Sequence, residues 1–204
     1  TDLAGSDGPE PALDLGADLA AQYGNDPGLW ANANMSPHFP YAAQLWLEMY
    51  ERHSGERLDG AIATDPVALG HVLGATGAVE LDDGTEVTAE NAADLTMREV
   101  YDRFPDHEDD EVRDEYLQEV AEAVVDALLE GRGDAGELAR ALATSVGERR
   151  LMVFSTDDAE QERLETTPVS GALATGPGPN VGVFMNNGSG SKLDYYLDQS
   201  VTSS

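Results

Sequence analysis

The hydrophobic pattern of the central part of the chain predicts alternating strands and helices. Residues 58–93 (LDGAIATDPVALGHVLGATGAVELDDGTEVTAENAA) read as strand, short helix, strand, turn, strand and the start of another helix. Asp65 stands where a helix N-cap belongs, Pro66 follows it, and Gly74 is expected to end the short helix. Asp82-Asp83-Gly84 is typical of a hairpin turn. The alternation favours an α/β (α+β) domain with a mixed central sheet flanked by helices.

Apolar stripes and alternations extend this pattern over most of the chain. Residues 1–31 form a polar segment that is partly loop, and residues 32–204 are expected to form a single α/β domain. Helices are predicted at residues 42–53, 92–101, 112–128, 138–146 and 157–164, and further strands at residues 151–155, 181–185 and 193–201.

The charge of the chain restricts its partners. The sequence holds 40 acidic residues against 11 basic ones, which gives a formal net charge of -29. Such a surface repels phosphate backbones and anionic lipid, so nucleic acid is excluded as a partner. We expect either a solvated, salt-tolerant surface or an attraction for cations and basic partners. The sequence contains no run of about 18 apolar residues, so no membrane span is predicted. The polar opening segment is expected to follow a removed anchor.

The residue types present exclude several kinds of chemistry. The chain has no cysteine, which excludes thiol catalysis, disulfides and cysteine-based metal sites. Its four histidines show no zinc spacing, and the acidic run at residues 107–111 lacks the alternation of a calcium loop. No Gly-x-Ser-x-Gly elbow is present. The residues themselves therefore predict no metal site and no evident cofactor.

Three sequence blocks together resemble a known family. They are NMSPHFPYAAQLWLEMY (residues 34–50), the block at residues 58–93 and NVGVFMNNGSGSKLDYYL (residues 180–197). As a set they resemble the bacterial domain-of-unknown-function family four-zero-one-two, which is common in actinobacteria. The resemblance runs from about Asn32 to the end of the chain. It implies an extracytoplasmic domain that is membrane-anchored in the full-length protein.

The order of elements is also similar, more distantly, to the second half of the LytR-CpsA-Psr cell-wall ligases. The shared order is a strand ending Asp-Gly-Ala-Ile, a short helix, an Ala-Thr-Gly-Ala-Val strand, a turn, then arginines and a long helix. Those enzymes transfer polyprenyl-linked glycan phosphates to peptidoglycan, using arginines to hold pyrophosphate and an acidic residue with magnesium. The likeness implies a LytR-CpsA-Psr-like fold and makes magnesium a candidate cofactor. The Arg-x-Arg spacing of those enzymes is absent here.

Four basic residues are the candidate ligand contacts. Arg98, Arg103 and Arg113 lie in the region of the ligases' arginines, and guanidinium groups bind phosphate well. For Arg98 and Arg103 the alternative is that they pair with the nearby acids Glu99, Asp102 and Asp106. Lys192 lies in a Gly/Ser/Asn loop. It is either a contact for an anionic ligand or a turn lysine that pairs with an acid. No catalytic residue can be assigned.

The leading hypothesis is an extracytoplasmic cell-envelope domain that binds a polyprenyl-phosphate or glycan ligand. If the protein is an enzyme, the resemblance implies a glycan phosphotransferase of the LytR-CpsA-Psr type. The alternative is a non-catalytic envelope interaction or scaffold domain, whose acidic face meets basic partners or cations. A positive pocket in so acidic a molecule would favour the first hypothesis, and a uniformly acidic surface without a deep pocket would favour the second.

Overall fold

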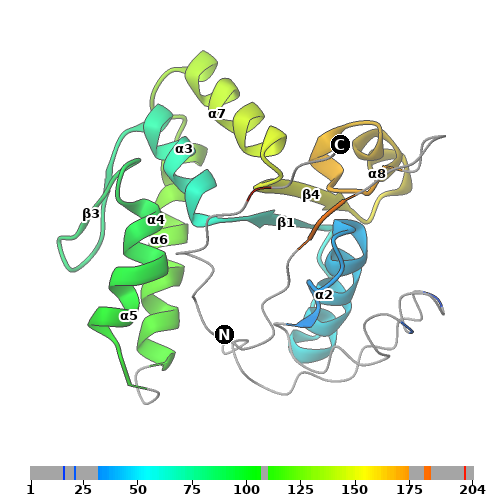
Figure 1. Ribbon diagram of the computed structural model, residues 1–204, viewed down its shortest axis with the longest axis horizontal. Coiled ribbons are helices and arrows are strands. Elements are labelled where there is room, and N and C mark those ends of the chain that lie inside the picture. The colour runs from blue at the N-terminus through cyan, green and yellow to red at the C-terminus, as the bar shows by residue number, and fades with distance from the viewer. Residues whose placement is uncertain are drawn as a thin grey trace.

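The computed structural model describes residues 16, 21, 32–106, 110–174, 182–184 and 200 (Figure 1). Helix dominates these residues, and the strands are short, which places the chain in the α+β class. The helices are α2 (Phe39–Ser54), α3 (Pro66–Thr76), α4 (Ala92–Asp94), the π-helical η2 (Leu95–Glu99), α5 (Val100–Arg103), α6 (Asp110–Leu129), α7 (Ala135–Gly147), α8 (Asp158–Glu165) and the 3-10 helix η4 (Pro168–Ser170). The strands are β1 (Gly60–Thr64), β2 (Val79–Glu80), β3 (Glu86–Val87) and β4 (Leu151–Ser155).

The strands do not form the mixed central sheet that the sequence predicted. In the described part of the chain they make two separate two-stranded antiparallel sheets, β1 with β4 and β2 with β3. The β2–β3 pair is the local hairpin expected around Asp82-Asp83-Gly84. In the other pair, Gly60 lies opposite Ser155 and Thr64 lies opposite Leu151. Among the described strands, both pairings are antiparallel, so neither sheet is mixed.

One face of the β1–β4 ribbon packs on α2. Ala61 and Ala63 of β1 and Met152 and Phe154 of β4 point to this face, because alternate residues of a strand share a side. They pack against Phe39, Ala42, Ala43, Trp46 and Leu47 of α2. Figure 1 shows α2 below the ribbon and α8 on its other side, close to β4. We call α2, the ribbon, α8 and η4 the ribbon region.

The remaining helices enclose the main hydrophobic core. Helix α3 packs on α4, α6 and α7, and the β2–β3 hairpin lies against α6 (Figure 1). The buried residues of this core are Val72, Leu73, Val79, Leu81, Val87, Ala92, Leu95, Val100, Tyr116, Val120, Val124 and Ala127. Those on α6 recur every three to four residues, as the predicted stripe at 112–128 requires. We call α3 through α7, with the hairpin, the helical region.

Local signals set most helix starts, and one predicted helix end is wrong. Asp65 caps α3 as predicted, since its carboxylate accepts the Ala68 N–H at 2.9 Å. Asp157 caps α8 in the same way. Gly74 does not end α3, because the helix continues to bury Ala75 and Thr76 before Gly77 closes it at φ 89°. Among the described residues, no helix has the length and apolar character needed to span a bilayer.

The predicted strands near the C-terminus are described only in part. Residues 182–184, inside the strand expected at 181–185, lie in no regular element, and Val183 and Phe184 are exposed. The strand expected at 193–201 falls outside the described residues except for Ser200, which also lies in no regular element.

Candidate functional site

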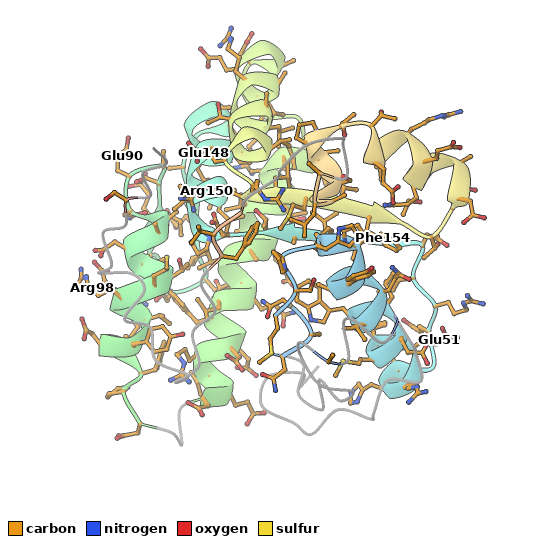
Figure 2. The ribbon with its side chains drawn as sticks, turned by 45° about the vertical axis from the view of Figure 1, so that its right-hand side comes forward. Glu51, Glu90, Arg98, Glu148, Arg150 and Phe154 are labelled. Atoms are coloured by element: carbon orange, nitrogen blue, oxygen red, sulfur yellow. The ribbon has the colours of Figure 1, made fainter. Side chains whose placement is uncertain are left out.

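Arg98 lies on η2 and is held by carboxylates of its own helical segment. Its guanidinium donates to both carboxylate oxygens of Asp94, at 2.7 and 2.5 Å, and to Asp102 at 3.3 Å. Glu99 also lies at 3.3 Å. The hydrogen bonds to Asp94 raise the pKa of Arg98 above its ordinary value. Figure 2 shows Arg98 at the outer side of the helical region. The guanidinium is thus matched by three acids, which leaves little net positive charge for a phosphate.

Arg103 and Arg113 each stack on an aromatic ring: Arg103 on Tyr116 of α6 and Arg113 on Tyr101 of α5. Arg103 donates to Asp83 of the β2–β3 turn at 2.8 Å, and its guanidinium lies 5.0 Å from the Tyr116 ring centre. Hydrogen bonds from Thr85, and then the charge of Arg103, lower the pKa of Asp83. Arg103 therefore ties the hairpin to α6.

Arg113 is the least exposed of the three candidate arginines. Its side chain is 16% exposed and stacks 4.9 Å from the Tyr101 ring centre. The guanidinium donates to the Phe104 carbonyl at 3.3 Å and to the Asp110 carboxylate. These contacts hold the start of α6 against α5, a structural role that the sequence did not indicate.

The candidate arginines lie outside the two grooves described below, neither of which is lined by Arg98, Arg103 or Arg113. Lys192 lies outside the described residues. Within the described ranges, no group of three His, Asp or Glu side chains could hold a metal ion, and the acids nearest the arginines bind guanidinium groups instead. The described residues therefore do not fit a magnesium site.

The largest concavity we describe lies between α2, the Ser155 end of the ribbon and α8. It has a volume of about 540 Å³. Its lining combines apolar side chains with hydroxyls, amides and carboxylates: Pro40, Tyr41, Gln44, Leu47, Glu48, Glu51, Leu58, Phe154, Ser155, Thr156, Asp158, Gln161 and Glu165, together with His38 and Arg57. Figure 2 labels Glu51 on α2 and Phe154 on β4, which both lie on this side of the molecule. We call this concavity the α2–α8 groove.

The charge of the α2–α8 groove is negative. Four carboxylates line it, from Glu48, Glu51, Asp158 and Glu165. The arginine in the lining, Arg57, is itself 3.6 Å from Glu51. Burial lowers the pKa of His38, although Glu165 opposes the shift, so the imidazole is neutral at pH 7. The groove therefore suits a neutral or cationic ligand.

A set of polar contacts holds the N-terminus of α2 in place beside this groove. The Leu173 N–H donates to His38 Nδ1 at 3.1 Å, and the Phe39 N–H donates to the Gly171 carbonyl at 3.2 Å. The Arg149 guanidinium donates to the carbonyls of Pro37 and Gly171 at 3.2 and 3.0 Å. We call these contacts the carbonyl clamp. It explains the Ser-Pro-His-Phe-Pro segment as a structural junction.

A second groove of about 420 Å³ lies between α3, α4 and α7, with a chain of polar groups nearby. His71 Nδ1 lies 3.0 Å from Ser145 Oγ, and His71 Nε2 lies 3.9 Å from Glu148. Burial opposes the charge of Arg150, but Asp65 and Glu148 outweigh it and raise the Arg150 pKa. Figure 2 shows Glu148 and Arg150 together. Ser145 is 0% exposed, so this Ser–His–acid series cannot present a nucleophile to a substrate.

Little in the sequence indicated the α2–α8 groove. Most of its polar residues come from α2 and α8, which are far apart along the chain, and none belongs to a spaced motif. The conspicuous segment at residues 36–40 supplies His38 and Pro40 and was the one available signal.

Comparison with known families gives one match. The family described as "Protein of unknown function (DUF4012)" matches residues 1–101. The match supports the DUF4012 family for this chain. The matched DUF4012 range includes the blocks at residues 34–50 and 58–93 but not the block at residues 180–197. No curated protein and no solved structure matches the chain.

Proposed function

We propose that this chain is an extracytoplasmic cell-envelope domain, membrane-anchored in its full-length protein, that binds a glycan in the α2–α8 groove. The cellular setting is what the resemblance described above implies, and the DUF4012 match supports the family but gives no location. The observation that carries the ligand class is the lining of the groove, where hydroxyls, amides and carboxylates surround Tyr41 and Phe154.

The groove suits a glycan because sugars need many hydrogen-bonding groups around an apolar surface. Carboxylates accept hydrogen bonds from sugar hydroxyls, and glutamine amides both donate and accept them. The Tyr41 ring, held edge-on at 4.5 Å from the His38 ring, offers a flat surface to a sugar face. The volume of the groove falls within the range of small-ligand sites.

Charge favours the glycan over a polyprenyl phosphate. A phosphate entering the groove would face four carboxylates and an arginine already paired with Glu51. Like charges brought together in this way oppose binding. The three arginines proposed to hold pyrophosphate are matched by acids in the chain, so phosphotransfer would first require breaking those pairs.

A titration with two ligands tests this proposal. Chitotetraose, a neutral oligosaccharide, should bind in calorimetry, whereas a short-chain polyprenyl phosphate with magnesium should not. Tyr41→Ala should weaken chitotetraose binding at least tenfold through loss of the ring surface. Arg98→Ala, outside the groove, should leave it unchanged. Binding of the phosphate that depends on Arg98 or Arg103 would overturn the proposal, as would failure of both chitotetraose and soluble peptidoglycan fragments to bind.

The non-catalytic scaffold remains the second candidate, and one observation favours it. The chain carries an excess of acids, and within the described residues β1 pairs along one edge only and holds no charged residue. That edge supports a more specific inference.

A further inference from the structure

Among the described residues, the outer edge of β1 pairs with no other strand, and its own sequence carries none of the usual protective residues. In the described part of the chain, β1 pairs with β4 alone (Figure 1). Its sequence, Gly-Ala-Ile-Ala-Thr, holds no charge and no proline. Soluble proteins normally protect such edges with lysine, proline or a bulge. The lack of protection stands out in a chain of which a quarter of the residues are charged.

The pairing shows which backbone groups this edge presents. The Thr156 N–H donates to the Asp59 carbonyl at 2.9 Å, and the register continues with Gly60 opposite Ser155. Hydrogen-bonded positions alternate along an antiparallel pair, so Ala61 and Ala63 exchange bonds with β4. The N–H and C=O of Ile62 therefore point away from β4. The Ile62 side chain is 70% exposed, on the ribbon face opposite α2.

The charges near one end of β1 are mainly acidic, although Arg57 lies two residues before Asp59. Asp59 precedes the strand, and Asp157, Asp158 and Glu160 lie just after its partner residues on β4. Asp157 accepts the Ala159 N–H at the start of α8, and Glu160 accepts the Ser155 hydroxyl. At the other end, the negative charge of Asp65 is balanced by its ion pair with Arg150. An added strand would thus meet a negative field at its Gly60 end.

We infer that β1 accepts an extended basic peptide segment as an additional strand, with apolar residues of that segment over Ile62 and lysines or arginines toward Asp59 and the start of α8. Main-chain hydrogen bonds to Ile62 would hold the strand, and charge would select it. A second copy of this chain fits the edge less well, because two surfaces of charge -29 would have to approach each other.

Amide hydrogen exchange of the full chain tests this inference with the peptide Lys-Val-Lys-Val-Lys-Val-Lys. The Ile62 amide should exchange rapidly in the chain alone and at least tenfold more slowly with peptide. The same peptide with alternate N-methylated amides keeps its charge but cannot pair as a strand, and it should give no protection. The acidic analogue Glu-Val-Glu-Val-Glu-Val-Glu should also fail.

Matched variants separate strand addition from general attraction. Ile62→Lys adds one positive charge at the edge and should weaken peptide binding at least tenfold. Leu129→Lys adds the same charge at a position 77% exposed on α6 and should leave binding within twofold. Both side chains are exposed, so both variants should fold. Equal effects of the two variants, or equal binding of the N-methylated peptide, would overturn the inference.

Two further results would also overturn it, each naming another occupant of the edge. A dimer of the wild-type chain in sedimentation that Ile62→Lys dissociates would assign the edge to a second copy. A slowly exchanging Ile62 amide in the chain alone would assign it to another part of the same chain. Because the edge and the α2–α8 groove are tested with different ligands, failure of one proposal leaves the other standing.

Discussion

The helical region and the ribbon region are held together in different ways. In the helical region, 12 buried residues form one continuous cluster shared by α3, α6 and the hairpin. In the ribbon region the buried residues fall into two small clusters, one around Phe39 and Phe154 and one around Met49. Contacts from side chains to backbone carbonyls supplement this thinner core, as the carbonyl clamp shows. Both proposed binding surfaces lie in the ribbon region, where less apolar surface is committed to packing.

The largest expected effect comes from opening the core of the helical region. Leu73 is 2% exposed within the main cluster. Leu73→Ala should lower the free energy of unfolding by about 3 kcal/mol, since it removes buried methyl groups and leaves a cavity. Urea denaturation followed by circular dichroism measures this loss. Leu129→Ala, at an exposed position, is the control and should change stability by less than about 0.5 kcal/mol. A small loss for Leu73→Ala would contradict the continuous core.

The next largest effect should come from the carbonyl clamp at Gly171. This residue has φ 61°, and a Cβ there would lie 2.5 Å from Met152 Sδ and 2.7 Å from Phe39 Cβ. Gly171→Ala should cost about 2 kcal/mol through backbone strain and overpacking. Gly55→Ala is the matched control, because Gly55 also has positive φ but open space around its Cβ position. It should cost less in the same urea experiment. Equal losses would show that the close contacts at Gly171 relax without cost.

The local parts of the fold could be predicted from the sequence, and the long-range pairing could not. The Asp65-Pro66 helix start and the hairpin after Leu81 depend on residues that are neighbours in the chain. The pairing of β1 with β4 joins distant segments, and no local pattern of Ala, Ile, Met or Val specifies its partner or direction. The predicted mixed sheet is wrong because the partner and direction of β1 were not specified locally.

The candidate site shows the same limit. Acids four residues before and after Arg98 predict pairing on one helix, and the structure confirms the pair with Asp102 that the sequence suggested. The partner of Arg103 is Asp83, which only the folded hairpin brings near. The α2–α8 groove likewise depends on how α8 returns over the ribbon after β4, which no residue spacing reveals.

A comparison of two arginines sharpens the contrast between the regions. Arg149 joins two backbone carbonyls from separate segments, whereas Arg98 pairs with acids on its own helical segment. Arg149→Ala should cost about 1 kcal/mol in urea denaturation, and Arg98→Ala should cause no measurable loss, because exposed pairs contribute little. Arg149 also has φ 58°, so Arg149→Gly should be more stable than Arg149→Ala. The contrast would be lost if Arg98→Ala destabilised the chain more than Arg149→Ala.

The smallest expected effect is a pH dependence that arises at His38. Burial lowers the pKa of His38 from its ordinary value of 6.5, Glu165 raises it and Arg149 lowers it further. Below pH 6.5 the unfolded chain therefore binds a proton that the folded chain resists, and stability falls as the pH falls. Protonation would also remove the Nδ1 acceptor of the Leu173 N–H. In His38→Asn an amide oxygen can take the place of Nδ1 and does not titrate. Melting temperatures between pH 7.5 and 5.5 should therefore fall less in this variant than in the wild-type chain, and identical slopes would show that His38 does not couple the clamp to pH.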